Sequence, residues 1–487
     1  MKKLSPLIKG TLTLTIAALI SRFIGFFYRI YLADAIGSEG MGLYQLISPI
    51  LTFSFALCAL GIQTAISKLV SEKPQNALYY LVCGTVISLS LSTIIALLVY
   101  VNAPFLAINW FRDERLISLL KILAFAIPLA CIHSCINGYY YGKSDSIIPA
   151  ISQLLEQITR VLSIYIISHF QIITPAITVF ALVCGEALGA IFSIFSLKLH
   201  KHFSLSVINN LTSGCKEIFN LSIFLTVNRV CIHFLSAIET ILLPQMLIKS
   251  GLSQSTALST YGILGGMALP LVLFPSALIN SFSVMLLPEV SKKNNTNNKN
   301  ALKTTCSKSI GFSLTFGIIF CGFFLIYGHE LGGIIFKDAL VSPYVKCLAF
   351  LCPFIYLCNT LSSILNGLAK TKDTFICAFA SHIISLIFVI IFVPKLGLYG
   401  YMLGLLISHL VESFMLFYCV SLNFDAIKNI AIPVLCVAIA FVISKWCLLT
   451  LRNISIFNNF LNLCISSGVY LLISFILYFK LATKKFL

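Results

Sequence analysis

Two arginines interrupt the first long apolar stretch of the chain, within the segment SRFIGFFYR at residues 21–29. A charged side chain inside a membrane costs on the order of 2.5–3.5 kcal/mol even on the lenient insertion scale, so it persists where it meets a polar cavity or a ligand. Arg22 and Arg29 are seven residues apart, close to two helical turns, which places both guanidinium groups on one helix face, roughly 10 Å apart along the axis. The spacing indicates a site for an anion.

Other charged side chains also fall within apolar stretches. Arg160 follows Glu156 by four residues, the favourable spacing for an ion pair across one helical turn, and we interpret this pair as structural. Glu186, Glu239 and Glu412 are lone glutamates. They suit proton or sodium coupling, neutral hydrogen-bonded carboxyl groups, or partners for the arginines, and the sequence leaves these alternatives open.

The elements that position these residues are transmembrane helices. Apolar residues make up 59% of the 487 residues and charged residues 10%, whereas soluble domains carry about 25% charged residues. Apolar runs of about 20 residues predict fourteen spans. The N-terminal run after MKKLSPLIKG is long and interrupted by Arg22, so we interpret it as the first span rather than as a secretory signal. The predicted fold is all-α and polytopic.

The formal net charge of +17 reflects topology rather than nucleic-acid binding. With the N-terminus inside and fourteen spans, about twice as many Lys and Arg residues fall on the inner side as on the outer side. This distribution predicts a multi-pass protein of the cell membrane with cytoplasmic N- and C-termini. It excludes nucleic acid as a partner and indicates contact with anionic membrane lipid.

The chain repeats itself at an offset of about 227 residues. Asn137-Gly138 is followed by Lys143 and Asp145, and Asn366-Gly367 is followed by Lys370 and Asp373. Glu186 and Glu412 fall at equivalent positions after these pairs. We therefore predict two parallel six-helix lobes around a central cavity, at residues 1–205 and 206–424, with two additional helices at 425–487. Transporters built from such repeats bind their substrate between the halves.

The duplication gives meaning to a third arginine. Arg229, beside Asn228 in the segment LTVNRVCIH, lies in the first helix of the second half, as Arg22 and Arg29 lie in the first helix of the first half. We expect all three arginines to face the cavity, with Asn228 as a further polar residue there. Arginine suits phosphate because its planar fork forms bidentate, charge-assisted bonds and keeps its charge.

Several other chemistries are excluded or disfavoured. The seventeen cysteines form no Cys-x-x-Cys pair, and we interpret those in apolar spans, including Cys131 and Cys135 beside His133, as packing residues rather than metal ligands. Residues 141–144, YGKS, resemble the end of a phosphate-binding loop but lack its first glycine. We expect a transporter rather than an enzyme, with no metal or cofactor, that draws on H⁺, Na⁺ or the membrane potential.

The chain resembles a known family. Fourteen spans with SRFIGFFYR in the first, IGSEGMGLYQLISPI at 36–50 and GMALPLVLFPSALINSFSVMLLPEVSK at 266–292 are similar to the polysaccharide-exporter branch of the multidrug/oligosaccharidyl-lipid/polysaccharide superfamily. Within it they resemble the stage V sporulation protein B group and, more distantly, the lipid II flippases. The latter carry Ser-Arg-x-x-Gly-x-x-Arg in span 1. Ser21, Arg22 and Gly25 match this pattern, and Arg29 comes one residue late.

The resemblance implies a flippase that moves an undecaprenyl-pyrophosphate-linked saccharide across the membrane by alternating access, with a lipid II-type precursor for the spore cortex as the expected cargo. The implied role of Arg22, Arg29 and Arg229 is to bind the pyrophosphate. We expect a monomer, with cell-wall synthesis enzymes as possible partners. A cation-coupled multidrug antiporter and a non-transporting scaffold for wall-synthesis enzymes are the alternatives.

Overall fold

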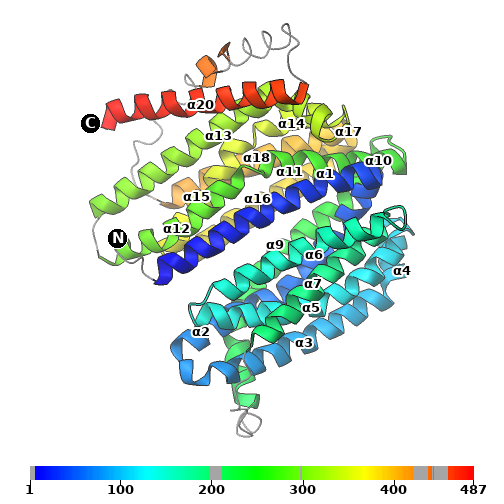
Figure 1. The fold of residues 1–487 in the computed structure, drawn as a ribbon, viewed down its shortest axis with the longest axis vertical. Helices are drawn as coiled ribbons and strands as arrows, with labels where there is room; N and C mark the ends of the chain where they lie inside the picture. The colour runs from blue at the N-terminus through cyan, green and yellow to red at the C-terminus, as the bar shows by residue number, and fades with distance from the viewer. Residues whose placement is uncertain are drawn as a thin grey trace. The chain divides into compact units, whose positions relative to one another are not determined.

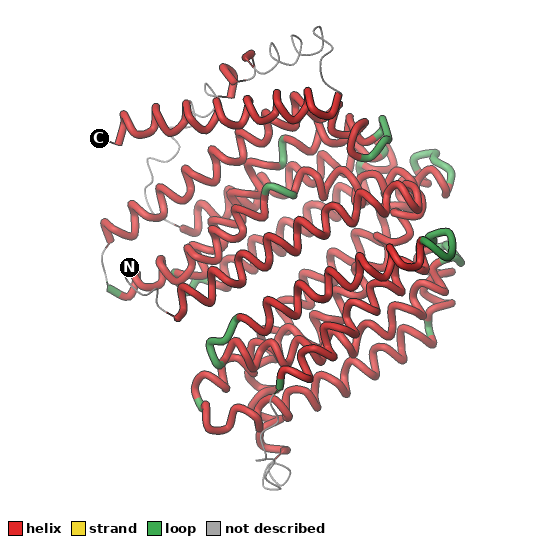
Figure 2. Tube along the Cα trace, in the orientation of Figure 1, coloured by secondary structure: helices red, strands yellow, loops and turns green. Residues whose placement is uncertain are grey.

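The computed structural model describes residues 6–197, 211–296, 299–420, 437–440, 442–443 and 459–486. These described residues form helices and turns, with no strand among them (Figures 1 and 2). The chain divides into two compact units, residues Met1–Gly262 and Ile263–Leu487. The predicted all-α class is confirmed. The predicted lobe boundaries at 205/206 and 424/425 lie outside the described residues.

The first unit is a bundle of long helices. Its α9 packs against α2 and α3. The elements are α1 (Pro6–Phe55), η1 (Ala56–Leu60), α2 (Gly61–Glu72), η2 (Pro74–Asn76), α3 (Ala77–Val101), α4 (Ala103–Phe105), η3 (Leu106–Phe111), α5 (Leu116–Gly142), α6 (Ile147–Ser168), α7 (Pro175–Ser196), α9 (Leu211–Lys249) and α10 (Gln254–Gly262).

A glycine divides the first helical stretch. Residues Thr13–Glu72 are continuously helical over 60 residues, which would extend about 90 Å if straight, three times the ~30 Å hydrocarbon core of a bilayer. The stretch breaks at Gly37, whose φ of 67° and ψ of 179° occur almost only in glycine. The break divides the stretch into two helical segments, and each is long enough to cross the hydrocarbon core.

The second unit is also helical. Its α14 and α15 follow each other with a bend of 51° between them. The elements are η4 (Ile263–Ala268), α11 (Leu269–Leu273), α12 (Ser276–Asn295), α13 (Lys299–Ile335), α14 (Val341–Ala349), α15 (Cys352–Gly367), α16 (Thr371–Ile391), α17 (Val393–Leu396), α18 (Leu398–Val420) and α20 (Asn459–Phe486).

The two units share a packing pattern. In the first, α5 packs against α2, α3 and α7, and α6 packs against α7. In the second, α15 packs against α12, α13 and α18, and α16 packs against α18. A Cβ at Gly138 would lie 2.6 Å from the carbonyl oxygen of Gln63, and one at Gly367 would lie 2.9 Å from that of Leu287. The glycines that indicated the duplication thus allow equivalent close helix contacts.

The number of membrane crossings stays a prediction. Among the described residues, nine helical stretches are long and apolar enough to cross a membrane, or ten with the bent pair counted. One of the nine contains the Gly37 break, so these stretches and crossings do not correspond one to one. Most of the predicted thirteenth span, around residue 438, lies outside the described residues.

Polar bonds hold the first unit at the Gly37 break. Arg115 donates from Nη1 to Glu39, at 2.8 Å, and from Nη2 to Asp113, at 2.7 Å. Ser255 donates to the other oxygen of Glu39 at 2.8 Å. The segment of α1 just after the Gly37 break is therefore attached to the starts of α5 and α10. At the far end of the returning helix, Lys73 bonds Glu217 at 2.6 Å.

Replacement of Gly37 tests the break. We expect Gly37→Ala to lower the free energy of unfolding by about 1–3 kcal/mol, because a side chain strains this backbone conformation. Thermal unfolding of the detergent-purified protein measures the change. Gly311→Ala, at a helical position with open space around it, is the matched control and should be neutral or stabilising. Equal stability of both variants would contradict the assignment.

The ion pair of Asp113 predicts a pH dependence. Burial raises the pKa of this carboxyl group, but the bonds from the Arg115 side chain and backbone outweigh burial and hold the pKa below its usual value of 3.8. A carboxyl group whose pKa is lowered on folding stabilises the protein at pH values above its unfolded-state pKa of 3.8. This contribution disappears as the pH falls through the folded-state pKa. Asp113→Asn should cost about 1–3 kcal/mol at neutral pH, and the difference should vanish in acid. Glu114→Gln, an exposed neighbour, is the control, and a constant difference across the pH range would refute the prediction.

Candidate functional site

The arginines of α1 lie on a different side of the helix from its exposed apolar stripe. The stripe consists of Ile16, Ile20, Phe23, Phe27 and Tyr31, each at least 42% exposed. At 100° per residue, positions 22 and 29 lie about 140–160° around the helix from this stripe. Arg22 is exposed and Arg29 half-buried. The stripe suits lipid tails, whereas exposed guanidinium needs water or an anion.

Helix α6 approaches α1 between the two arginines. A Cβ at Gly25 would lie 3.7 Å from Oε1 of Gln157, and Ser21 is buried. The small residues of the span-1 pattern therefore face neighbouring helices, and Arg22 lies beside this contact. The guanidinium of Arg29 interacts electrostatically with Arg160 and with Tyr44. Arg29 thus lies next to a buried charge network.

That network joins α5, α6 and α7. Arg160 donates to Glu156 at 2.7 Å, as their spacing predicted, and lies 3.5 Å from Glu186. His133 Nε2 lies 3.1 Å from Glu186, and the Asn137 amide lies 3.3 Å from His133 Nδ1. No sequence pattern predicts a role for His133. The structure shows it as the partner of Glu186.

Several polar atoms near the network are buried without a protein hydrogen-bond partner. They are Oη of Tyr28, Nε of Arg160 and Oδ1 of Asn137. An unsatisfied buried polar group costs about 1–3 kcal/mol, so such groups are normally bonded to protein or to ordered water. Tyr28 interacts electrostatically with Arg160. The interior of the first unit is therefore polar enough to hold water around its charges.

The third predicted arginine bonds a neighbouring helix. Arg229 Nη1 donates to the Leu60 carbonyl at 2.6 Å, and its Nη2 lies 3.5 Å from Oγ1 of Thr64. A Cβ at Gly61 would lie 1.9 Å from the Thr226 hydroxyl oxygen, so only glycine allows α9 this close to α2. Part of the donor capacity of Arg229 is thus used to join α9 to the start of α2.

The remaining predicted polar residues are separate from this network. Asn228 is half-buried on α9, and Glu239 is 7% exposed on the same helix, near enough to Tyr261 to interact with it electrostatically. Glu412 belongs to the second unit, where Oε2 lies 3.1 Å from Nδ1 of His409. Glu186 and Glu412, which the duplication made equivalent, therefore both have a histidine partner.

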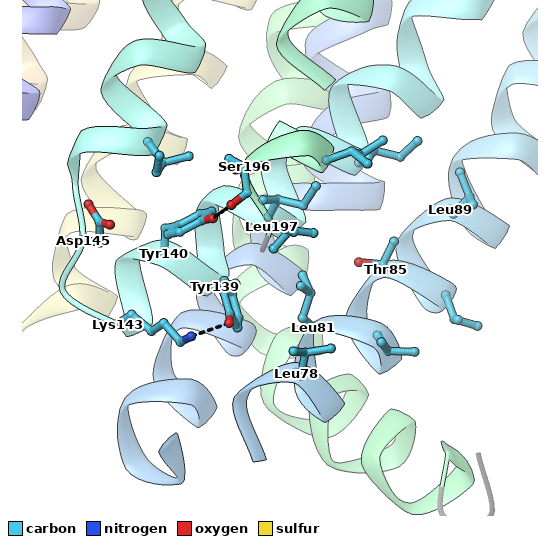
Figure 3. Close-up of a pocket in the computed structure, with 16 residues that line it drawn as sticks. Leu78, Leu81, Thr85, Leu89, Tyr139, Tyr140, Lys143, Asp145, Ser196 and Leu197 are labelled. Carbon is cyan, nitrogen blue, oxygen red and sulfur yellow. Dashed lines mark hydrogen bonds between the residues drawn. The ribbon is translucent and has the colours of Figure 1, made fainter. Parts of the chain in front are cut away.

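A groove of about 880 Å³ lies over α3, α5 and α7, and its wall is mainly leucine, isoleucine and valine. Figure 3 shows Lys143 bonded to the Tyr139 hydroxyl, and Tyr140 donating to the Ser196 carbonyl. The groove has one lysine, already engaged, and one aspartate, Asp145. It suits hydrocarbon better than pyrophosphate. The YGKS segment ends α5 and enters a turn, without a preceding strand in the described residues.

The fold and the site define a multi-pass membrane transporter. Its helices are apolar and long enough to cross a membrane, its two units are similarly packed, and charged side chains are buried within them. The chain belongs to the polysaccharide biosynthesis protein family, whose model matches residues 7–294. The MatE family model matches residues 220–391.

The chain is also similar in sequence or fold to individual proteins of known name. Stage V sporulation protein B of Bacillus subtilis (strain 168) is 27% identical over 412 residues, 81% of this chain and 79% of that protein. Lipid II flippase MurJ of the same organism is 23% identical over 317 residues, 59% of this chain and 58% of its own. A solved structure of lipid II flippase MurJ in an inward closed conformation matches with a TM-score of 0.74 and 19% identity, covering 97% of this chain and 100% of that chain. This likeness shows the transporter fold.

Removal of Arg160 tests the charge network. We expect Arg160→Ala to destabilise the protein by about 3–5 kcal/mol, because Glu156 and Glu186 would lose their buried cationic partner. Arg160→Ala combined with Glu156→Gln should recover part of the loss. Thermal unfolding in detergent measures both, with the exposed Lys216→Ala as control. If Arg160→Ala were as stable as the wild-type protein, Arg160 would not be needed to stabilise Glu156 and Glu186.

Proposed function

We propose that this protein is a flippase for an undecaprenyl-pyrophosphate-linked saccharide, and that its cargo is a lipid II-type peptidoglycan precursor destined for the spore cortex. Family membership, the similarity to stage V sporulation protein B and the fold shared with lipid II flippase MurJ support this proposal. The cargo would move from the inner to the outer leaflet by alternating access.

The observation that carries the proposal is the arginine face of α1. Arg22 is exposed within a helix of membrane-crossing length, and Arg29 follows about 10 Å further along the same face. A pyrophosphate carries several negative charges and oxygens that accept two parallel N–H bonds from a guanidinium group. Arg22 would make the first contact. Arg29 would hold the anion beside the polar interior of the first unit.

Arg229 would contribute a third positive charge from α9. Its bond to the Leu60 carbonyl fixes its position relative to α2 and leaves other N–H groups of the guanidinium for a ligand. Asn228 and Glu239 on the same helix would adjust the polarity around the sugars. In this proposal the apolar groove over α3, α5 and α7 is not the pyrophosphate site.

For the energy source we propose the membrane potential. Bound pyrophosphate would neutralise the arginines, and the emptied, positively charged site would be drawn inward by an inside-negative potential. Each unit charge that crosses the full field is worth about 2.3 kcal/mol per 100 mV. H⁺ or Na⁺ coupling through the network of Glu186 and His133 is the alternative, because these groups can change their charge together.

A second candidate function follows from the match of the MatE family model to residues 220–391. A cation-coupled multidrug antiporter of that branch would need carboxylates at its substrate site. The glutamates Glu186 and Glu239 could serve such a role, but Glu186 is already paired with His133 and lies 3.5 Å from Arg160. The arginine face of α1 therefore favours the flippase.

Reconstituted flipping distinguishes the two functions. In proteoliposomes that contain a fluorescent lipid II, we expect Arg22→Ala and Arg29→Ala to slow flipping about 10–100-fold, since a charge-assisted hydrogen bond contributes about 1.5–3 kcal/mol. Arg22→Lys should retain part of the rate, because it keeps the charge but not the bidentate fork. The matched control is Arg112→Ala, an exposed arginine outside the spans.

Wild-type flipping in both alanine variants would contradict the role of the arginine face. Absence of flipping by the wild-type protein, combined with uptake of a cationic dye that exchanges for protons, would favour the antiporter.

A further inference from the structure

A second group of chemically reactive side chains lies in the second unit. Cys358 on α15 and His409 and Glu412 on α18 place one sulfur, one ring nitrogen and one carboxylate oxygen within 4.8 Å of one another. His409 Nδ1 lies 3.1 Å from Glu412 Oε2. The Cys358 thiol donates to the His409 carbonyl across a distance of 3.6 Å. The three donor atoms therefore converge from two packed helices.

His409 and Glu412 lie at the middle of α18, a helix of membrane-crossing length. His409 is eleven residues from the start of α18 at Leu398, about 16 Å along the axis and so half the ~30 Å hydrocarbon core. Among the described residues, the ion-pair partner of Glu412 is His409. The equivalent Glu186 of the first unit has Arg160 as a second cationic neighbour. Within the described part of the second unit, no arginine pairs with Glu412.

We propose that Cys358, His409 and Glu412 bind one divalent transition-metal ion of the Zn²⁺ class. A thiolate and a carboxylate carry two negative charges together, so a divalent ion with a neutral imidazole makes the site neutral inside the membrane. Na⁺, Mg²⁺ and Ca²⁺ prefer oxygen ligands, whereas a sulfur, nitrogen and oxygen set suits Zn²⁺ and Co²⁺. Binding replaces the thiol proton, which leaves to solvent as the sulfur–metal bond forms.

The geometry requires only a small adjustment. In a tetrahedral zinc site, bonds of about 2.0–2.3 Å place neighbouring ligand atoms about 3.3–3.6 Å apart. His409 Nδ1 and Glu412 Oε2 are already 3.1 Å apart. All three donor atoms lie within 4.8 Å of one another, so the Cys358 sulfur needs to move by only about 1 Å to reach this spacing. Water, or the Cys377 thiol, which interacts electrostatically with Cys358, would complete the coordination.

The cluster is enclosed but not sealed. Cys358 is 5% exposed and the Glu412 side chain 13%, whereas the His409 side chain is 29% exposed. An ion would reach the site past the imidazole ring. Once bound, it would link α15 to α18 and stabilise the second unit. The site uses none of the arginines of α1 or α9, and it assigns Glu412 to a divalent ion rather than to H⁺ or Na⁺ coupling.

Cobalt titration tests this site. Purified, metal-free, full-length protein in nanodiscs is titrated with Co²⁺, which reports thiolate ligation by a charge-transfer band in the near ultraviolet. We expect one Co²⁺ per chain, displaced by Zn²⁺. Cys358→Ser should abolish the band, and His409→Gln and Glu412→Gln should each weaken Co²⁺ binding about tenfold or more.

Two controls make the result specific. Cys306→Ser removes another fully buried thiol of the same hydrophobic core and should leave the band unchanged. Arg22→Ala should also bind Co²⁺ normally, which separates this site from the flippase proposal. A wild-type protein without the band, or a Cys358→Ser variant that keeps it, would overturn the proposal. If Cys358→Ser aggregates, wild-type Co²⁺ affinity in both other variants would overturn it equally.

Discussion

The structure depends above all on the free-energy cost of charge inside a membrane. A bilayer offers no water to an unpaired guanidinium or carboxylate group, so each must find a partner, a hydrated interior or a ligand. The chain carries charged residues within several apolar helices and meets this constraint in different ways. Within the first unit, Arg160 pairs with Glu156 and lies 3.5 Å from Glu186, which also bonds His133. Arg229 donates to a backbone carbonyl of the neighbouring helix. Arg22 is exposed on the side of α1 opposite its apolar stripe.

The duplication lets one architecture satisfy this constraint twice with different chemistry. Both units pack a central helix, α5 or α15, against three others, and both pair an intramembrane glutamate with a histidine at 3.1 Å. In the first unit an arginine adds a permanent positive charge. In the second unit Cys358 joins the cluster, and in the proposed metal site its thiolate and the Glu412 carboxylate together supply two negative charges to a divalent ion. The two buried clusters thus differ in their charge and in the ligands they can hold.

Much of the fold could be predicted from the sequence because its signals are local. Apolar runs predict helices, the Glu156–Arg160 pair follows from helical spacing, and the Asn-Gly pairs mark close helix contacts. The pairing of His133 with Glu186 could not be predicted, because 53 residues and the whole of α6 separate them in the sequence. The hydrogen-bond acceptor of Arg229 could not be predicted either, because it is a main-chain carbonyl group and every residue type has one. The duplication does not predict that Glu186 and Glu412 both have a histidine partner. His133 lies on a different helix from Glu186, whereas His409 lies on the same helix as Glu412, so the two histidines are not at equivalent positions.

In the proposed function, the arginine face of α1 binds a lipid pyrophosphate. Direct binding of lipid II to the purified protein, with and without Arg22, tests this claim without reference to the energy source or to the cell. We predict that Arg22→Ala weakens lipid II binding about tenfold or more, and that free inorganic pyrophosphate competes with the lipid for the wild-type protein. Equal lipid II affinity of the wild-type protein and the Arg22→Ala variant, without competition by pyrophosphate, would contradict the account.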